Sequence, residues 1–244
     1  MKYFELKCKT FIKKDIEFID SFDILSKYIN FSMCQIEEYE KSHNENKFTN
    51  YCFGNFYPIE KSKIYKSGNI YDFIIRSLDE QFIKRLQDLL RENINHTYIQ
   101  VLQTTIKTVK QFFISELYSV TPVIVSVKDE NNKNIFWTIS KDGDILKLQK
   151  QLQDNLEKKY QNFFDEKIES NQNFIQLLEL KNQKQQSIFF TKNSKEDSKK
   201  IRLFGNKFKI IPNEDEVSQK LAFIALACGL GEKQSYGGGF SIWN

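Results

Sequence analysis

The run Gly229-Leu-Gly-Glu-Lys-Gln-Ser-Tyr-Gly-Gly-Gly239 holds five of the nine glycines in this chain of 244 residues. An apolar helical pattern precedes it and only Phe240 to Asn244 follow, which predicts a helix, a glycine loop and a short final strand. A dinucleotide fingerprint or a P-loop would need a helix after its glycines. Gln234 also replaces the third fingerprint glycine, and no hydroxyl residue follows Lys233. Main-chain amides free of Cβ atoms can form an anion nest, so the tail indicates contact with an RNA backbone.

The first half of the chain has the order strand, helix, two strands, helix and strand. Residues 4–9 alternate apolar and charged side chains, as a half-buried strand does. Ser77 and Glu80 have the spacing of a capping box, which predicts the start of the second helix. The pattern predicts strands over 4–9, 47–57, 71–75 and 98–114, and helices over 21–39 and 78–90. This is the order of a ferredoxin-like domain.

The second half repeats this order. It predicts a hairpin over 123–127 and 135–139, strands over 174–180, 187–192 and 201–211, and helices over 144–163 and 217–228. Gly205-Asn206 reads as a two-residue hairpin turn, and Asn213 with Glu216 as a helix cap. The predicted fold is therefore α+β, with two tandem ferredoxin-like βαββαβ domains at 1–116 and 117–244. Such sheets are a common platform for single-stranded RNA.

Composition sets limits on the class of protein. The net charge of +4 is a weak sign of a polyanionic partner. The four cysteines are scattered without a CxxC pair, and two histidines do not complete a ligand set, so we expect no metal and no cofactor. Neither a secretion signal nor a membrane-length apolar stretch is evident, so we expect a cytoplasmic protein with reduced thiols and no membrane contact.

Basic residues gather in one short segment near the tail. Lys199, Lys200, Arg202, Lys207 and Lys209 fall within eleven residues of the predicted hairpin. Alternate residues of a strand share a face, so several of these cations are expected to contact phosphate together. We select Lys200, Arg202 and Lys207 as RNA-binding candidates. The polar stretch before them, 149–200, is interpreted as a solvated helix and loop.

The tail resembles the glycine-rich signature of the sixth Cas family, the CRISPR-associated endoribonucleases that process precursor crRNA. That signature runs approximately Gly-x-Gly-x-x-x-Ser-x-Gly-x-Gly, and it is matched by Gly229, Gly231, Ser235, Gly237 and Gly239. Residues 119–127 look like the family's entry into its second domain, and residues 47–53 look like the strand after its histidine. The likeness covers nearly the whole chain, but only the tail is specific.

The resemblance implies a metal-independent ribonuclease that cuts one phosphodiester of the CRISPR repeat, leaving a 5′-hydroxyl and a 2′,3′-cyclic phosphate. The chemistry requires a base for the 2′-hydroxyl, an acid for the 5′-oxygen and a cation for the phosphorane. His43 matches the family's catalytic histidine, and Tyr28 and Lys47 match its tyrosine and lysine. The loop from Gly229 to Gly239, with Lys233, Gln234 and Ser235, would hold the RNA backbone.

Helix geometry tests the proposed triad. On one straight helix, Tyr28 and His43 would lie roughly 22 Å apart and could not share a phosphate. A triad therefore requires a break, for which Asn30-Phe31-Ser32 is the expected place. If the helix does not break, Tyr39 becomes the better tyrosine, because it lies four residues before His43 on the same face.

Two other functions stay open from the sequence. Looser versions of the tail occur in related Cas subunits, so a catalytically inactive RNA-binding subunit of a CRISPR effector complex is the first alternative. An RNA-binding protein with no CRISPR link is the second. The expected partner is the repeat RNA of precursor crRNA, and the sequence leaves open whether other Cas subunits or a second copy of the chain also bind.

Overall fold

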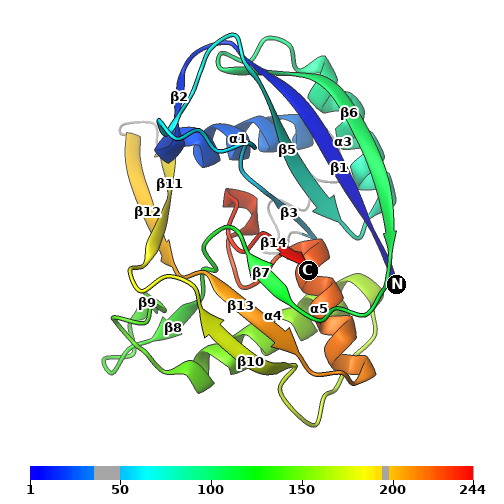
Figure 1. Cartoon of the computed structure of the whole chain (residues 1–244), viewed down its shortest axis with the longest axis vertical. Coiled ribbons are helices and arrows are strands. Elements are labelled where there is room, and N and C mark those ends of the chain that lie inside the picture. The colour runs from blue at the N-terminus through cyan, green and yellow to red at the C-terminus, as the bar shows by residue number, and fades with distance from the viewer. Residues whose placement is uncertain (36–49, 194–197, 244) are drawn as a thin grey trace.

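The chain folds around two antiparallel sheets, which lie one above the other in Figure 1. The computed structural model describes residues 1–35, 50–193 and 198–243. The segment 36–49, which contains Tyr39, His43 and Lys47, lies outside the described residues.

The first sheet is built entirely from the first half of the chain. Its strands follow the order β3-β5-β1-β6, and every neighbouring pair is antiparallel. The apolar side of β1 faces the helices, because Phe4, Leu6 and Cys8 share a buried cluster with residues of both helices. The elements are β1 (Lys2–Ile12), α1 (Phe18–Met33), β3 (Tyr51–Phe53), β5 (Ile70–Ser77), α3 (Glu80–Glu92) and β6 (Ile99–Lys110). This topology is that of a ferredoxin-like domain.

The second sheet repeats the same topology. Its strand order is β10-β13-β7-β14, again antiparallel throughout. The elements are β7 (Leu117–Ser119), α4 (Ile145–Phe164), β10 (Ile175–Leu180), β13 (Phe208–Pro212), α5 (Glu216–Cys228) and β14 (Ser241–Trp243). The α+β class with two tandem ferredoxin-like units is therefore confirmed. We propose the domain boundary between residues 116 and 117, because the first sheet ends at Lys110 and β7 begins at Leu117.

The hairpin predicted at Gly205-Asn206 is wrong. β12 (Ser198–Gly205) pairs with β11 (Gln186–Asn193) in a separate two-stranded ribbon, whereas β13 enters the second sheet. The chain passes tightly against residue 123 at this point: Val123 N donates to Asn206 O, and a Cβ on Gly205 would lie 2.3 Å from Val123 O. Gly205 is therefore required by a close backbone approach and not by a turn.

The hairpin predicted over 123–139 does form, but outside the second sheet. β8 (Ser126–Lys128) pairs with β9 (Asn134–Phe136), whereas the strand that enters the sheet is β7, which precedes this hairpin. The alternating valines at 123, 125 and 127 predicted a strand, and the structure does bury these side chains. Burial alone does not distinguish a sheet strand from a covered loop, which explains the difference.

Two of the predicted helix caps shift by two residues. Asp79 Oδ1 accepts from Phe82 N at 2.9 Å, and Asp215 Oδ1 accepts from Ser218 N at 3.0 Å. Ser77 instead ends β5, and its hydroxyl accepts from Asp79 N. A cap must directly precede the first helical turn, so the nearer aspartate takes the role in each case. Asp144, the first residue of the predicted helix, caps α4.

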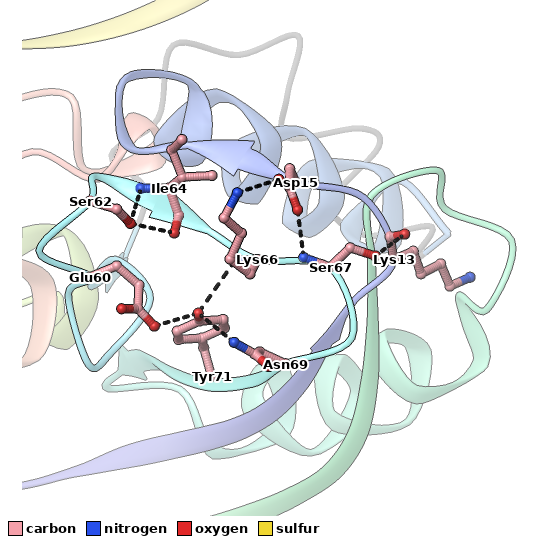
Figure 2. A network of polar contacts seen from close by, with 9 residues as sticks. All are labelled: Lys13, Asp15, Glu60, Ser62, Ile64, Lys66, Ser67, Asn69 and Tyr71. Atoms are coloured by element: carbon pink, nitrogen blue, oxygen red, sulfur yellow. Dashed lines mark hydrogen bonds and ion pairs between the residues drawn. The ribbon is translucent and has the colours of Figure 1, made fainter.

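A polar network holds the loop between β3 and β5 against the end of β1 (Figure 2). Within this loop β4 (Ile64–Tyr65) pairs with β2 (Ile16–Glu17), directly before α1. Asp15 accepts from Lys66 Nζ and from Ser67 N, both at 2.8 Å. Tyr71 donates to Glu60 Oε1 at 2.6 Å. These contacts fix the start of α1, the helix whose other end leads into the segment with His43.

Arg76 on β5 links the two sheets. Its guanidinium is buried, contacts Glu5 Oε2 at 2.8 Å and donates to Ser241 O of β14 at 2.6 Å. The same group lies 4.5 Å from the centre of the Phe240 ring. A planar guanidinium can stack on a ring while it donates in its own plane, and a lysine could not do both. The C-terminal strand is thereby attached to the first domain.

Candidate nucleic-acid interface

The glycine loop, residues 229–239, lies between the two domains. Figure 1 shows it in red between the sheets, below α1. A Cβ on Gly237 would lie 2.4 Å from the Phe22 ring of α1, and one on Gly229 would lie 3.1 Å from Cβ of Cys52 on β3. Both glycines also have positive φ, 85° and 78°. The loop therefore needs glycine in order to pack against the first domain.

The backbone amides of the glycine loop are largely occupied within the protein. Their acceptors are Ala225 O for Gly229, Gly239 O for Leu230, Gln234 O for Gly237, Lys233 O for Gly238 and Pro122 O for Gly239. These amides are not available to a phosphate, so the anion nest expected from the sequence is wrong for them. Gln234 is also buried, and its Nε2 donates to the carbonyls of Leu230 and Gly231.

The accessible part of the loop is its tip, residues 233–236. Lys233 is exposed, and Ser235 and Tyr236 are partly exposed. The tip is held in place by α1, because Ser26 Oγ donates to Ser235 O at 2.7 Å. The Tyr236 ring stacks on Phe190 of β11 with 4.2 Å between ring centres. Lys233 and Ser235 therefore remain on the surface as RNA-binding candidates.

A buried lysine that the sequence interpretation missed supports the loop from inside. Lys159 of α4 is fully buried, and its Nζ donates to Gly229 O at 2.7 Å and to Gly231 O at 3.0 Å. Burial lowers the pKa of this ammonium to about 8. Helical spacing was the available signal, since Lys159 continues the buried positions Leu152 and Leu156. Most other residues of this segment are polar, so the segment was interpreted as a solvated helix and the burial of Lys159 was missed.

The Lys159 pKa predicts a stability change in mild alkali. The folded value, about 8, is below the ordinary value of about 10.4, so the unfolded chain binds more protons between these two pH values. Stability should therefore rise with pH in this window. Relative to Lys159→Met, the wild type should gain about 2 kcal/mol in free energy of unfolding between about pH 7.5 and about pH 9.5. Urea unfolding of both proteins at the two pH values measures this difference. An equal change in the free energy of unfolding of the two proteins would contradict the prediction.

Tyr28 lies in the core of the first domain and not on its surface. Its hydroxyl donates to Leu90 O at 2.5 Å and to Asn93 O at 3.2 Å, and burial raises its pKa. The helix break expected at residues 30–32 is wrong, because α1 continues to Met33. Ser32 is buried within the helix, where its hydroxyl donates to Tyr28 O at 3.0 Å instead of capping a new helix. Tyr28 thus joins α1 to the end of α3.

The β11–β12 ribbon has one apolar face and one cationic face. Ile188 and Leu203 are buried in the core of the first domain. On the opposite side, register places Phe189 across from Arg202. The Arg202 guanidinium lies 5.2 Å from the Phe189 ring and 4.6 Å from the Phe204 ring, and Lys200 Nζ lies 5.4 Å from Phe189. We call Phe189, Lys200, Arg202 and Phe204 the cationic face.

The other predicted cations do not join this face. Lys209 belongs to the second sheet and forms an ion pair with Glu116. Lys207 is partly buried, and its pKa is lowered by burial and by the charge of Lys63. The expectation that several of these basic residues share one hairpin face therefore holds only for Lys200 and Arg202, because the chain changes sheets between Arg202 and Lys207.

Within residues 1–35, 50–193 and 198–243, no group of three His, Cys, Asp or Glu side chains is placed to hold a metal ion. No helix among these residues combines the length and apolar character that crossing a membrane requires.

Known proteins of similar sequence or structure share the fold described above. The family model described as CRISPR associated protein Cas6, C-terminal, matches residues 106–241, more than half of the chain. The CRISPR-associated endoribonuclease Cas6 2 of Methanocaldococcus jannaschii is 25% identical over 232 residues, which cover 90% of this chain and 92% of the relative. A solved CRISPR associated protein Cas6 superimposes with a TM-score of 0.69 at 19% identity, and a RAMP protein binding different RNA substrates with 0.70 at 17%, each over 99% of both chains. The chain therefore belongs to the Cas6 family of CRISPR-associated proteins.

Proposed function

We propose that this protein is an endoribonuclease that binds the repeat of precursor crRNA and cuts it at one phosphodiester. The observation that carries the proposal is the convergence of three elements on one surface. The loop tip contacts α1 through Ser235, Tyr236 stacks on the ribbon, and Thr191 N of the ribbon donates to Asp23 Oδ1 of α1 at 3.1 Å. The glycine loop, which carries the family signature, and the ribbon, which carries the cationic face, thus both contact α1. This helix precedes the segment that contains His43 in the sequence.

The proposed chemistry is transfer within the RNA, without a metal ion. Removing the proton from the 2′-hydroxyl lets this oxygen attack the adjacent phosphorus, and the 5′-oxygen leaves with a proton. His43 is the proposed acid or base, since an imidazole titrates near neutral pH. Lys47 is the proposed cation for the phosphorane. Tyr39 replaces Tyr28 as the assisting tyrosine, because the Tyr28 hydroxyl is buried and already donates to carbonyls.

The cationic face is the proposed path of the RNA on the second domain. A base can stack on Phe189 or Phe204 while Lys200 and Arg202 contact neighbouring phosphates. The ion pair between Lys200 and Asp20, at 2.6 Å, is exposed and can be exchanged for a phosphate at small cost.

The double substitution Lys200→Ala with Arg202→Ala should weaken repeat-RNA binding and reduce its salt dependence. Each phosphate contact contributes about 0.7 to the slope of log K against log salt for a single strand, so the slope should fall by about 1.4. The matched control is Lys150→Ala with Lys158→Ala, which removes the same charge from exposed positions on α4. Binding isotherms at several salt concentrations measure both slopes. Equal slopes for the two double variants would remove the cationic face from the RNA path.

The proposed function is tested by incubating the wild-type protein with its genomic repeat RNA in EDTA. A single cut with 2′,3′-cyclic phosphate and 5′-hydroxyl ends is the expected result. Tight binding without cleavage would instead support an RNA-holding subunit of an effector complex, which the likeness to the RAMP protein favours. Binding without preference for the repeat would contradict a role in crRNA processing.

A further inference from the structure

A cleft opens between the end of α1 and the turn after α3, and none of the predicted site residues in the described part of the chain lines it. It has a volume of about 430 Å³. Phe31 and Gln35 line it from the α1 side, and Asn93, Asn95 and His96 line it from the turn. Among the described residues that line it, Glu92 alone carries a charge, and none is a lysine or an arginine. An uncharged ligand therefore fits this cleft better than a phosphate does.

His96 supplies a fixed hydrogen-bond donor. Tyr98 N donates to its Nδ1 at 3.4 Å, so in the neutral ring the proton lies on Nε2. Burial and the charge of Lys13 lower the pKa of His96, which favours the neutral ring at physiological pH. The ring packs edge-on against Tyr28, with 5.1 Å between ring centres. Tyr28 is itself held by hydrogen bonds to two carbonyl oxygens, so the imidazole packs against a side chain that is fixed in place.

Phe31 supplies an apolar face. Its side chain is 60% exposed although it lies near the end of a well-packed helix. The amides of Gln35 and Asn95 lie on the same cleft, and each offers both a donor and an acceptor. An exposed ring beside amide groups and an imidazole N–H matches what an unstacked base presents, namely a flat face and a polar edge.

The cleft is also within reach of the proposed RNA path. Ser26, which holds the loop tip, and Phe31 are both on α1, and five residues of helix span about 7.5 Å along its axis and turn about 140° around it. An RNA strand that passes the loop tip could therefore place a nearby nucleotide at the cleft.

We infer that this cleft binds one unstacked nucleobase of the repeat RNA, with Phe31 as the stacking surface and His96 as a donor to the edge of the base. The inference rests on the proposed function, since it names a specificity site for the same substrate. It concerns binding and places no new residue in the cleavage reaction.

The test compares Phe31→Ala with Phe113→Ala, because both phenylalanines are 60% exposed. Binding is measured for the intact repeat and for a series of repeats with one abasic nucleotide each. Wild-type protein should lose about 5- to 150-fold in affinity at one abasic position. Phe31→Ala should bind the intact repeat that much more weakly and show no further loss at that position. Phe113→Ala should behave like the wild type.

His96→Phe gives a second, independent readout. It keeps an aromatic ring against Tyr28 but removes the donor, so the preference among the four bases at the sensitive position should weaken. Equal behaviour of Phe31→Ala, Phe113→Ala and the wild type, with an unchanged base preference in His96→Phe, would overturn the inference while repeat cleavage still supports the proposed function. If the wild type neither binds nor cuts the repeat, the proposed function itself fails.

Discussion

His43→Ala should abolish cleavage of the repeat RNA and leave its affinity nearly unchanged. A positioned acid or base contributes about 10²- to 10⁴-fold to a rate, and the other histidine of the chain, His96, is already assigned to the cleft described above. Single-turnover cleavage and RNA binding are measured on the same preparation. Asn44→Ala, one residue further along the same segment, is the control and should cut at the wild-type rate. Cleavage by His43→Ala at the wild-type rate would remove the histidine from the proposed mechanism.

The tyrosine assignment is decided in the same assay. Tyr28→Phe should keep the cleavage rate within a few-fold, because the lost hydroxyl bonds the carbonyls of Leu90 and Asn93 inside the core, although some stability should be lost. Tyr39→Phe should slow cleavage more than Tyr28→Phe does. The reverse order would return Tyr28 to the site and require the end of α1 to rearrange when RNA binds.

Gly239→Ala should be the most damaging single change in the glycine loop. The φ of Gly239 is +68°, and an added Cβ would lie 1.9 Å from Leu230 O and 2.9 Å from Leu230 N. The contacted atoms are backbone, and the same two residues are joined by the bond from Leu230 N to Gly239 O. The methyl group can be accommodated only if the loop separates. We expect a loss of about 4 kcal/mol or more in the free energy of unfolding, at the upper end of single-residue effects.

Gly68→Ala is the matched control. Its φ is +86°, but no atom lies within 4 Å of the added Cβ, so only backbone strain of about 1–2 kcal/mol applies. Urea unfolding of both variants distinguishes the free-energy cost of the steric clash from the cost of the backbone strain. If Gly239→Ala proves as stable as Gly68→Ala and loses only RNA affinity, the signature glycine contacts RNA directly and our structural account of it is wrong.

The sequence by itself determined the strands of the first sheet and the α-helices of both domains. Alternation along β1 and β5, helical spacing in α5 and the glycine that ends α5 are local signals, because each depends on residues within one or two turns of the chain. The order of these elements then restricts the topology to the ferredoxin-like pattern, which both sheets follow. The glycine signature likewise identified the family, which the match over residues 106–241 confirmed.

The tertiary structure alone decided what these elements contact. The burial of Lys159 against Gly229, the core position of Tyr28 and the separation of β12 from β13 depend on atoms distant in sequence. A lysine in a polar helix is ordinarily solvated. Lys159 is buried because the tertiary structure places the carbonyls of the glycine loop within hydrogen-bond distance of its ammonium. The same holds for the loop itself: its composition suggested amides open to RNA, whereas packing between two domains directed most of them to acceptors within the protein.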